Sequence, residues 1–286
     1  MKGWAIIIML PALALPCPGQ STADRPGALP QHRDRGHWGY SADENIHRSF
    51  AVSGAGPHRL EVDNVNGYIH VTGKAAGPIE VSVAKHIDAE TNDELERAKR
   101  DVTLDMSEQD NGVRLYADGP FRHHGDDGHR GYRVIFDYDI QVPADTTLDL
   151  KTVNSGDIVV KQTTGDYTIH GLNGGIEMDA VAGSGKVDTL NGPVKVSFAR
   201  NPARPSEFHS LNGGIDVYFQ PGLNAGLKFH TLNGGIYADF DVTLGGQNSG
   251  MYHVNHRAME AHVGQGGPLL AFDTLNGSIR LHTNGK

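Results

Sequence analysis

Phe208-His209-Ser210-Leu211-Asn212-Gly213-Gly214-Ile215-Asp216-Val217 is one of two nearly identical stretches of this chain; the other is Phe229-His230-Thr231-Leu232-Asn233-Gly234-Gly235-Ile236-Tyr237-Ala238. An earlier, looser copy surrounds Asn66. Further copies place asparagines 18 to 22 residues apart through the second half of the chain: Asn154, Asn173, Asn191, Asn212, Asn233, Asn255 and Asn276. In the Asn255 copy, His256 and Arg257 replace the two glycines. A steady period near 20 residues is typical of repeat proteins in which each copy forms one turn of a coil.

Each copy predicts two strands joined by a sharp bend. Because strand side chains alternate between two faces, Phe208 and Ser210 share the face of Asn212. After the glycines, Ile215 and Val217 resume that inward face. We expect glycine at the corner because a φ above zero there would disfavour other residues. The sequence therefore predicts an all-β fold in which residues 151–284 form a parallel β-solenoid of about seven rungs.

The asparagines are predicted to form an internal ladder. Stacked strands lie roughly 4.8 Å apart, so equivalent amides would lie above one another and hydrogen-bond along the stack. An unpaired buried amide costs about 1–3 kcal/mol, and a continuous ladder avoids that cost. The predicted members are Asn154, Asn173, Asn191, Asn212, Asn233 and Asn276.

A leucine precedes five of these asparagines, and strand alternation places it on the outer surface. These leucines are Leu172, Leu190, Leu211, Leu232 and Leu275. An exposed stripe of this kind would mark a partner-binding surface. In the alternative interpretation, the corner begins earlier or another segment covers the leucines, and they are buried within the chain.

Residues 45–150 are predicted to form a β-rich region that carries one short helix and covers one end of the solenoid. Residues 132–142 alternate apolar and polar side chains, as a strand does. Thr91 followed by Glu94 predicts a helix start with a capping box. Asp110-Asn111-Gly112 predicts a hairpin turn between two further strands.

The N-terminus has the features of a secretory signal. Lys2 precedes an apolar stretch from Trp4 to Leu15, and small residues allow cleavage after Ala23. We interpret residues 1–23 as a signal peptide and the polar residues 24–44 as a flexible tether. No apolar run is long enough for a transmembrane segment after cleavage. These features predict an exported protein, which is periplasmic, on the cell surface or secreted.

Charge and cysteine content narrow the choice of partners. The chain has 25 Lys and Arg against 34 Asp and Glu; without Lys2 the charge becomes 24 − 34 = −10. A surface this acidic is not expected to bind nucleic acid. The single cysteine, Cys17, lies in the signal, so the mature chain has no disulfide; a lipid anchor on Cys17 is the alternative, for which Pro16 is a poor fit.

Candidate metal ligands gather in one histidine-rich loop: His123, His124, Asp126 and His129. Imidazoles and carboxylates at this density can bind zinc, nickel or copper. The glycines of the loop favour a solvated segment instead, because metal sites need oriented ligands. We therefore predict no bound metal and no cofactor.

Other polar columns were considered as chemical sites. His170, His209 and His230 occupy equivalent positions, so adjacent rungs could place imidazoles side by side, but Lys151, Asp188 and Asp273 share the column, and we interpret it as a solvated face. The outward column between the Ile and Val of the copies is Glu177, Lys195, Asp216, Tyr237 and Arg280, which is scattered. No Gly-x-Ser-x-Gly or His-Glu-x-x-His motif occurs. No catalytic residue is predicted.

The spaced Asn-Gly-x-Ile-x-Val copies behind a signal peptide resemble the bacterial putative-adhesin family, also called the auto-transporter adhesin head-GIN type. The resemblance covers roughly Ile46 to His282 and is best at Asn66, Asn173, Asn212, Asn233 and Asn276. It implies a right-handed parallel β-solenoid at the cell envelope, without an established enzymatic activity. The family motif is structural, so it implies no catalytic residues.

The sequence thus predicts a non-enzymatic, adhesin-like or scaffold protein that acts through its solenoid surface on an envelope protein or a polysaccharide. Two alternatives remain open: a polysaccharide-active β-helix enzyme, and a metal-responsive envelope sensor that uses the histidine-rich loop. Because the chain ends five residues after Leu281, we also expect the C-terminal rung to be uncapped and to self-associate.

Overall fold

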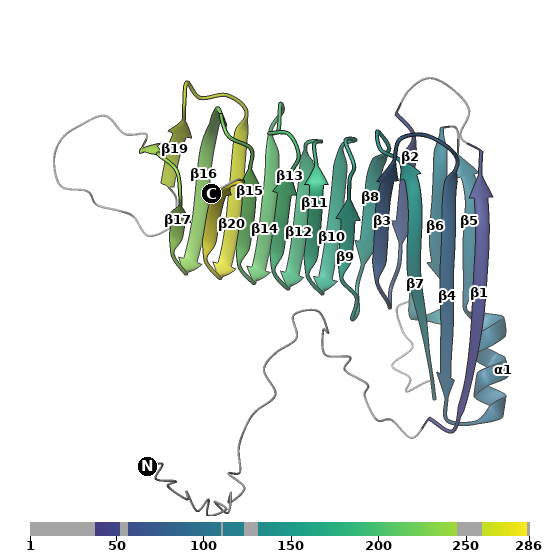
Figure 1. Ribbon diagram of the computed structural model, residues 1–286. Helices are drawn as coiled ribbons and strands as arrows, with labels where there is room; N and C mark the ends of the chain where they lie inside the picture. The colour runs from purple at the N-terminus through teal and green to yellow at the C-terminus, as the bar shows by residue number, and fades with distance from the viewer. Residues whose placement is uncertain (1–37, 52–56, 110, 123–130, 245–258, 285–286) are drawn as a thin grey trace, which may run out of the picture. The chain divides into compact units, whose positions relative to one another are not determined.

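Two large β-sheets make up the fold of residues 38–51, 57–109, 111–122, 131–244 and 259–284, which a computed structural model describes (Figure 1). Sheet A has the strand order β1 (Tyr40–Phe50), β4 (Ile79–Ala89), β7 (Tyr132–Pro143), β3 (Ile69–Lys74), β9 (Ile158–Lys161), β11 (Ile176–Val181), β13 (Val194–Phe198), β15 (Ile215–Phe219), β21 (Ile279–Thr283) and β17 (Ile236–Ala238). Sheet B has the order β18 (Thr243–Leu244), β19 (Met259–Val263), β16 (Ala225–Asn233), β20 (Leu269–Asn276), β14 (Ser206–Asn212), β12 (Gly185–Asn191), β10 (Tyr167–Asn173), β8 (Thr147–Thr152), β2 (Arg59–Asp63), β6 (Gly112–Asp118) and β5 (Thr103–Gln109). Both sheets mix parallel and antiparallel pairs, and neither is closed. Because strands form nearly all of the regular structure in the described residues, the all-β prediction is confirmed.

Each repeat copy that lies within the described residues contributes one strand to each sheet. β14 lies in sheet B, and β15, which follows the Gly213-Gly214 bend, lies in sheet A. Strands of neighbouring copies pair in parallel and in register, so that Asn191 lies opposite Asn212 and Val196 opposite Val217. Equivalent side chains therefore form straight rows that run across the strands.

The last repeat copy lies between two earlier ones. β20 pairs with β14 on one side and β16 on the other, and β21 lies between β15 and β17 (Figure 1). The phenyl ring of Phe272 stacks between those of Phe208 and Phe229, with centroid distances of 5.3 and 5.4 Å. The prediction that the C-terminal rung forms the uncapped end is therefore wrong. That end of sheet A is β17, whereas sheet B continues through antiparallel β19 and β18.

The core lies between the two sheets and consists of the inward-facing side chains of both. Phe208, Phe272, Ile215 and Val217 are fully buried, as the alternation predicts. The asparagines from Asn173 onward are exposed, however, as is Asn154, so the predicted internal position of the ladder is wrong. The alternation fails because the sheet B strands end at these asparagines, where the chain turns toward sheet A and both the leucine and the asparagine reach the surface.

The buried hydrogen bonds at the corner come from hydroxyl groups two residues before the asparagines. Each hydroxyl donates to the carbonyl of a glycine in the neighbouring copy: Thr189 to Gly174 (3.0 Å), Ser210 to Gly192 (2.8 Å), Thr274 to Gly213 (2.9 Å) and Thr231 to Gly277 (3.0 Å). These bonds satisfy carbonyl groups that the bend leaves without strand partners.

The glycine that follows Asn173, Asn191, Asn212, Asn233 or Asn276 is required for close approach. A Cβ added to Gly213 would lie 2.1 Å from the carbonyl oxygen of Gly192, and one added to Gly277 would lie 2.1 Å from that of Gly213. The positive φ that we expected at these corners occurs at Gly67 (φ 110°) and not at Gly213 or Gly277. The expectation is therefore wrong for the later copies, where the stacking distance excludes a side chain.

The N-terminal half confirms the locally encoded elements. Helix α1 (Asn92–Asp101) begins after Thr91, whose hydroxyl accepts a hydrogen bond from the Glu94 backbone N–H, and it packs mainly against β4 and β7. The predicted hairpin is formed by β5 and β6, and the predicted strand at residues 132–142 is β7. A short 3₁₀ turn, η1 (Pro120–Arg122), follows β6.

Two predicted boundaries differ from the structure. β1 begins at Tyr40 and pairs with β4 along its whole length, so the flexible tether cannot extend to residue 44. The Asn66 copy, formed by β2 and β3, pairs in parallel with β8 and β9, so both sheets run through the expected division at residue 150. The predicted signal peptide lies outside the described residues, as does the Asn255 copy.

Candidate binding groove on sheet B

A row of leucines runs across the outer face of sheet B, on β10, β12, β14, β20 and β16. The side chains of Leu172, Leu190, Leu211 and Leu232 are 36–44% exposed, and Leu275 is half-buried. Side chains from consecutive strands are roughly 4.8 Å apart, so the row extends for about 19 Å. We call this row, with the polar residues beside it, the leucine groove.

One edge of the leucine groove is the amide ladder. Asn191 donates to Asn173 (2.8 Å), Asn212 to Asn191 (2.8 Å), Asn276 to Asn212 (2.7 Å) and Asn233 to Asn276 (2.7 Å). Asn173 donates to the backbone carbonyl of Val153 at 3.3 Å, whereas Asn154 forms a backbone bridge with Asn66. The ladder is a surface feature that runs beside the leucine row, whose spacing is set by the in-register pairing of the strands.

The opposite edge carries alternating imidazoles and carboxylates. In spatial order the row is Lys151, His170, Asp188, His209, Asp273 and His230. Asp273 lies between His209 and His230, so the imidazoles that the sequence order would place side by side are separated. The Nδ1 atom of His230 is 2.8 Å from an Asp273 carboxylate oxygen, whereas the nearest His170–Asp188 and His209–Asp273 atom pairs are 3.9 and 4.0 Å apart.

A second charged row lies two residues before the histidine row in each strand. Its spatial order is Asp149, Thr168, Lys186, Glu207, Ala271 and Lys228. Lys186 approaches Asp188 at 4.0 Å, and Glu207 approaches His209 at 3.6 Å. Exposed pairs at such distances contribute little free energy, so these side chains can turn toward a partner. The hollow between the leucine row and the histidine row has a volume of about 590 Å³.

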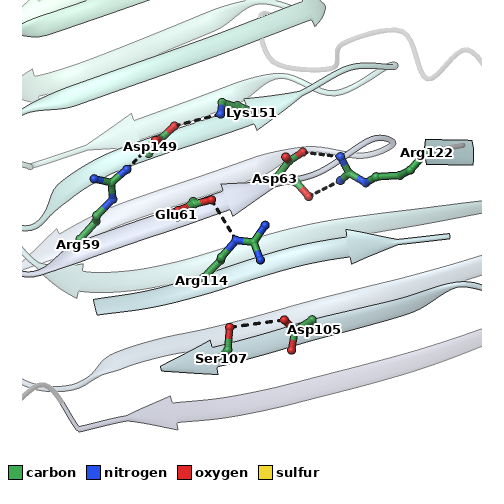
Figure 2. Close-up of polar contacts among 9 residues, drawn as sticks. All are labelled: Arg59, Glu61, Asp63, Asp105, Ser107, Arg114, Arg122, Asp149 and Lys151. Atoms are coloured by element: carbon green, nitrogen blue, oxygen red, sulfur yellow. Dashed lines mark hydrogen bonds and ion pairs between the residues drawn. The ribbon is translucent and has the colours of Figure 1, made fainter. Parts of the chain in front are cut away.

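The leucine groove ends where tightly paired charges begin. Figure 2 shows three ion pairs beside the groove: Arg59 of β2 with Asp149 of β8 (2.9 Å), Arg114 of β6 with Glu61 of β2 (3.1 Å), and Arg122 of the turn η1 with Asp63 of β2 (3.0 Å). The guanidinium groups of Arg114 and Arg122 also lie over the ring of Tyr116. These cations are occupied within the chain, which sets this part of sheet B apart from the leucine groove.

A second hollow lies on the outer face of sheet A, and its lining includes His47, His70, Glu80 and Asp139. The ring of Tyr68 stacks on that of His70 at 4.1 Å, and its hydroxyl donates to Asp139 at 3.2 Å. Burial, followed by the charge of Asp139, raises the pKa of Tyr68 to about 12. Burial also raises the pKa of Asp137, whose carboxylate accepts a hydrogen bond from the Tyr68 backbone N–H at 3.0 Å.

The outward column of sheet A is ordered when it is read across the strands. Because β21 lies between β15 and β17, the order is Glu177, Lys195, Asp216, Arg280 and Tyr237. Lys195 pairs with Glu177 at 3.0 Å, and Arg280 pairs with Asp216 at 3.6 Å. The scatter inferred from the sequence is therefore a consequence of listing the copies in chain order.

The remaining sequence candidates are less informative. His123, His124, Asp126 and His129 lie outside the described residues. Among the residues that the structure describes, no group of three or more His, Cys, Asp or Glu side chains is arranged to hold a metal ion. None of the described helices is long and apolar enough to cross a membrane.

Sequence reasoning missed the charged row that contains Lys186, Glu207 and Lys228. Each of these residues lies five positions before an asparagine of the ladder, and this constant spacing was the available signal. It also missed the hydroxyl bonds of Thr189, Ser210, Thr231 and Thr274, although a Ser or Thr two residues before the asparagine recurs in these copies.

Comparisons with known proteins find only distant structural likenesses. No family model matches the chain, and no curated protein matches it. Among solved structures, a "putative cell adhesion protein" from Clostridium sporogenes is 12% identical, with 85% of this chain and 100% of that chain covered at a TM-score of 0.43. A "putative adhesin" from Bacteroides fragilis is 13% identical, with coverages of 83% and 97% and a TM-score of 0.40. A "putative lipid binding protein" from Parabacteroides distasonis is 12% identical, with coverages of 84% and 96% and a TM-score of 0.30. At this level of similarity, the function must be argued from the surface of the chain itself.

Proposed function

We propose that this chain is a non-enzymatic, adhesin-like or scaffold protein that attaches to its partner through the leucine groove. The observation that supports the proposal is the exposed row formed by Leu172, Leu190, Leu211, Leu232 and Leu275. An apolar row between a charged edge and an amide edge has the composition of a binding surface, because burial of the leucines supplies free energy and the polar edges supply specificity.

The fold suits this role. We infer that the stacked copies form a right-handed parallel β-solenoid of the kind found in the bacterial putative-adhesin family. The in-register parallel pairing of β10, β12 and β14 supports the solenoid. A solenoid presents equivalent side chains in long rows, which is how repeat proteins build extended binding surfaces.

The location proposed for the protein follows from its first residues. The apolar stretch from Trp4 to Leu15, followed by small residues before the predicted cleavage site, supports export to the periplasm, the cell surface or the medium. In those compartments, an envelope protein or a polysaccharide is the expected partner.

Attachment of bacterial cells that display the full chain tests the function. Displaying cells are mixed either with one another or with cells that lack the chain, and attachment is counted in both mixtures. Replacement Leu211→Asp places a charge in the middle of the leucine row and is expected to reduce attachment at least about tenfold. Tyr237→Asp is the matched control, because Tyr237 is an exposed apolar side chain on sheet A. Equal attachment by the Leu211→Asp and control cells would overturn the proposal, as would an absence of attachment in both mixtures.

A second candidate function, polysaccharide cleavage, is supported by the hollow on sheet A. Asp139 lines that hollow and accepts a hydrogen bond from the Tyr68 hydroxyl, while burial favours the protonated form of the neighbouring Asp137, as a general acid requires. Release of reducing ends from envelope polysaccharides, with loss of that activity in Asp137→Asn, would support cleavage and contradict the non-enzymatic proposal.

A further inference from the structure

Three rows of side chains lie on the outer face of sheet B: the leucine row, the histidine row and the second charged row. Each of these rows can face the same row of a second copy with matching charge or apolar character. We propose that the leucine groove binds the leucine groove of a second copy of this chain, face to face, across a two-fold axis that lies between β12 and β14 and runs parallel to the strands. This inference names the partner of the binding surface and therefore rests on the proposed function. It makes attachment homophilic, which means that both surfaces must carry the protein.

The symmetry determines which strands meet. A two-fold axis parallel to the strands keeps each row opposite the same row and reverses the order of the strands. With the axis between β12 and β14, β12 faces β14 of the second copy, β10 faces β20, and β8 faces β16. The axis then lies at the centre of these six strands.

The charges match in this arrangement. Lys186 faces Glu207 of the second copy, and Lys228 faces Asp149 of the second copy, which remains paired with its own Arg59 at 2.9 Å. In the histidine row, Asp188 faces His209 and His170 faces Asp273. Only Lys151 and His230 bring two basic side chains together, at the margin. Because the interface is isologous, each pair occurs twice.

The apolar side chains match as well. Leu190 faces Leu211 of the second copy, and Leu172 faces Leu275, so the leucine rows cover one another. The amides of Asn191 and Asn212 are already hydrogen-bonded along their own ladder and can lie at the border of the interface without new partners.

Other positions of the axis bring like charges together. An axis through β12 would place Lys186 opposite Lys186 and Asp188 opposite Asp188. An axis through β14 would place Glu207 opposite Glu207. An axis that runs across the strands, between the leucine row and the histidine row, would place each of these rows opposite the other. Charged side chains would then be buried against apolar ones. The position between β12 and β14 is therefore the favoured one.

The expected affinity is low. Six strands at about 4.8 Å and three rows of side chains cover roughly 500 Å² per copy, below the ~800 Å² per partner of a standard interface. We expect a dissociation constant on the order of micromolar or weaker, which many molecules on two facing surfaces would strengthen by avidity.

Mixing two charge-reversal variants tests the arrangement. Lys186→Glu alone places two carboxylates opposite each other in both symmetry-related pairs, and Glu207→Lys alone places two ammonium groups there. Sedimentation velocity should show each variant associating at least about tenfold more weakly than the wild type. An equimolar mixture should associate again, because every pair between the two variants is then complementary. No effect within one chain can produce that recovery.

Lys195→Glu is the matched control, because it reverses a lysine on sheet A and should leave association unchanged. Wild-type association by either single variant, or failure of the mixture to recover, would overturn the proposed axis. A wild type that stays monomeric at millimolar concentration would overturn the second copy as partner.

A disulfide measurement covers the case in which the charge variants fold poorly. In a Cys17→Ser background, Leu190→Cys and Leu211→Cys chains should form a mixed disulfide more readily than either forms with itself, because residues 190 and 211 face each other across the axis. Equal cross-linking in all three samples would contradict the arrangement.

The cell assay separates the two proposals. Attachment of displaying cells only to cells that lack the chain would overturn the second copy as the partner and leave the adhesin-like function intact.

Discussion

Asn276 donates its side-chain amide to the side chain of Asn212, 2.7 Å away, although the two residues are 64 positions apart in the chain. Chain order would place Asn233 beside Asn212. Asn233 instead donates to Asn276, also at 2.7 Å. The last copy thus separates the two copies that are most alike in sequence, and the properties of the leucine groove depend on this order.

The amide ladder gives a graded stability prediction. Asn276→Ala removes hydrogen bonds to Asn212 and Asn233, and because these amides are exposed we expect a loss of about 1–2 kcal/mol in the free energy of unfolding. Asn233→Ala, at the end of the described ladder, should lose about 0.5–1 kcal/mol. Urea denaturation measures both values. A larger loss for Asn233→Ala would show that the ladder bonds do not determine the effect.

The two glycines of the bend should respond differently to alanine. In Gly213→Ala the new methyl group would meet the Gly192 carbonyl at 2.1 Å, and forcing the copies apart should cost about 1–3 kcal/mol. In Gly214→Ala the nearest atom, the Ser278 carbonyl oxygen, is 3.4 Å away, so we expect a change below about 1 kcal/mol in either direction. Thermal unfolding of the two variants checks the order, and similar shifts would contradict the close-approach explanation.

Cysteine pairs test the position of β20. In a Cys17→Ser background, Glu207→Cys with Ala271→Cys places thiols on adjacent strands, with Cα atoms about 5 Å apart and within reach of a disulfide. Glu207→Cys with Lys228→Cys places them two strands apart, at about 10 Å, which exceeds that reach. Non-reducing electrophoresis and mass spectrometry should detect a cross-link in the first pair. A cross-link in the second pair instead would indicate that β16, and not β20, lies beside β14.

The pairing of β1 with β4 should depend on pH through His86. Its Nδ1 atom lies 2.5 Å from Asp43 on β1, its Nε2 atom lies 2.9 Å from Asp88, and the hydrogen bond to Asp43 is the main cause of its raised pKa. A folded pKa above the unfolded value of about 6.5 means that this contribution is complete below pH 6.5 and is lost as the pH rises through the folded value.

Unfolding curves across pH 5.5 to about 9 should therefore show a stability difference between the wild type and His86→Gln that shrinks as the pH rises. Asp43→Asn should lower the titration midpoint of His86 in NMR spectra. A stability difference that does not change with pH would refute this role.

Local signals predicted local structure well. The alternation of Val134, Phe136 and Tyr138 produced a buried strand face, and Thr91 capped the only α-helix in the described residues. These features depend on neighbouring residues in the chain, so they can be inferred without knowing which strands pair.

The order of the copies could not be inferred in the same way. The copies around Asn212, Asn233 and Asn276 are so alike in sequence that the motif alone does not indicate their order. The charges give a retrospective signal: the observed order places Arg280 directly beside Asp216, whereas chain order would place Tyr237 between them. The exposure of the asparagines was missed because the prediction assumed strict strand alternation at the leucine and asparagine of each copy. The strands of sheet B end there, so both side chains reach the surface.

The place of β20 between β14 and β16 also bears on how the chain folds. Residues 269–276 follow β14 and β16 in the chain, yet they supply the inner neighbour of both strands. Until they arrive, β14 and β16 have a free edge each, and contacts this distant in sequence form slowly. A chain cut short before Leu269 would keep both of these edges open, so the two sides of the sheet become continuous only when β20 has inserted.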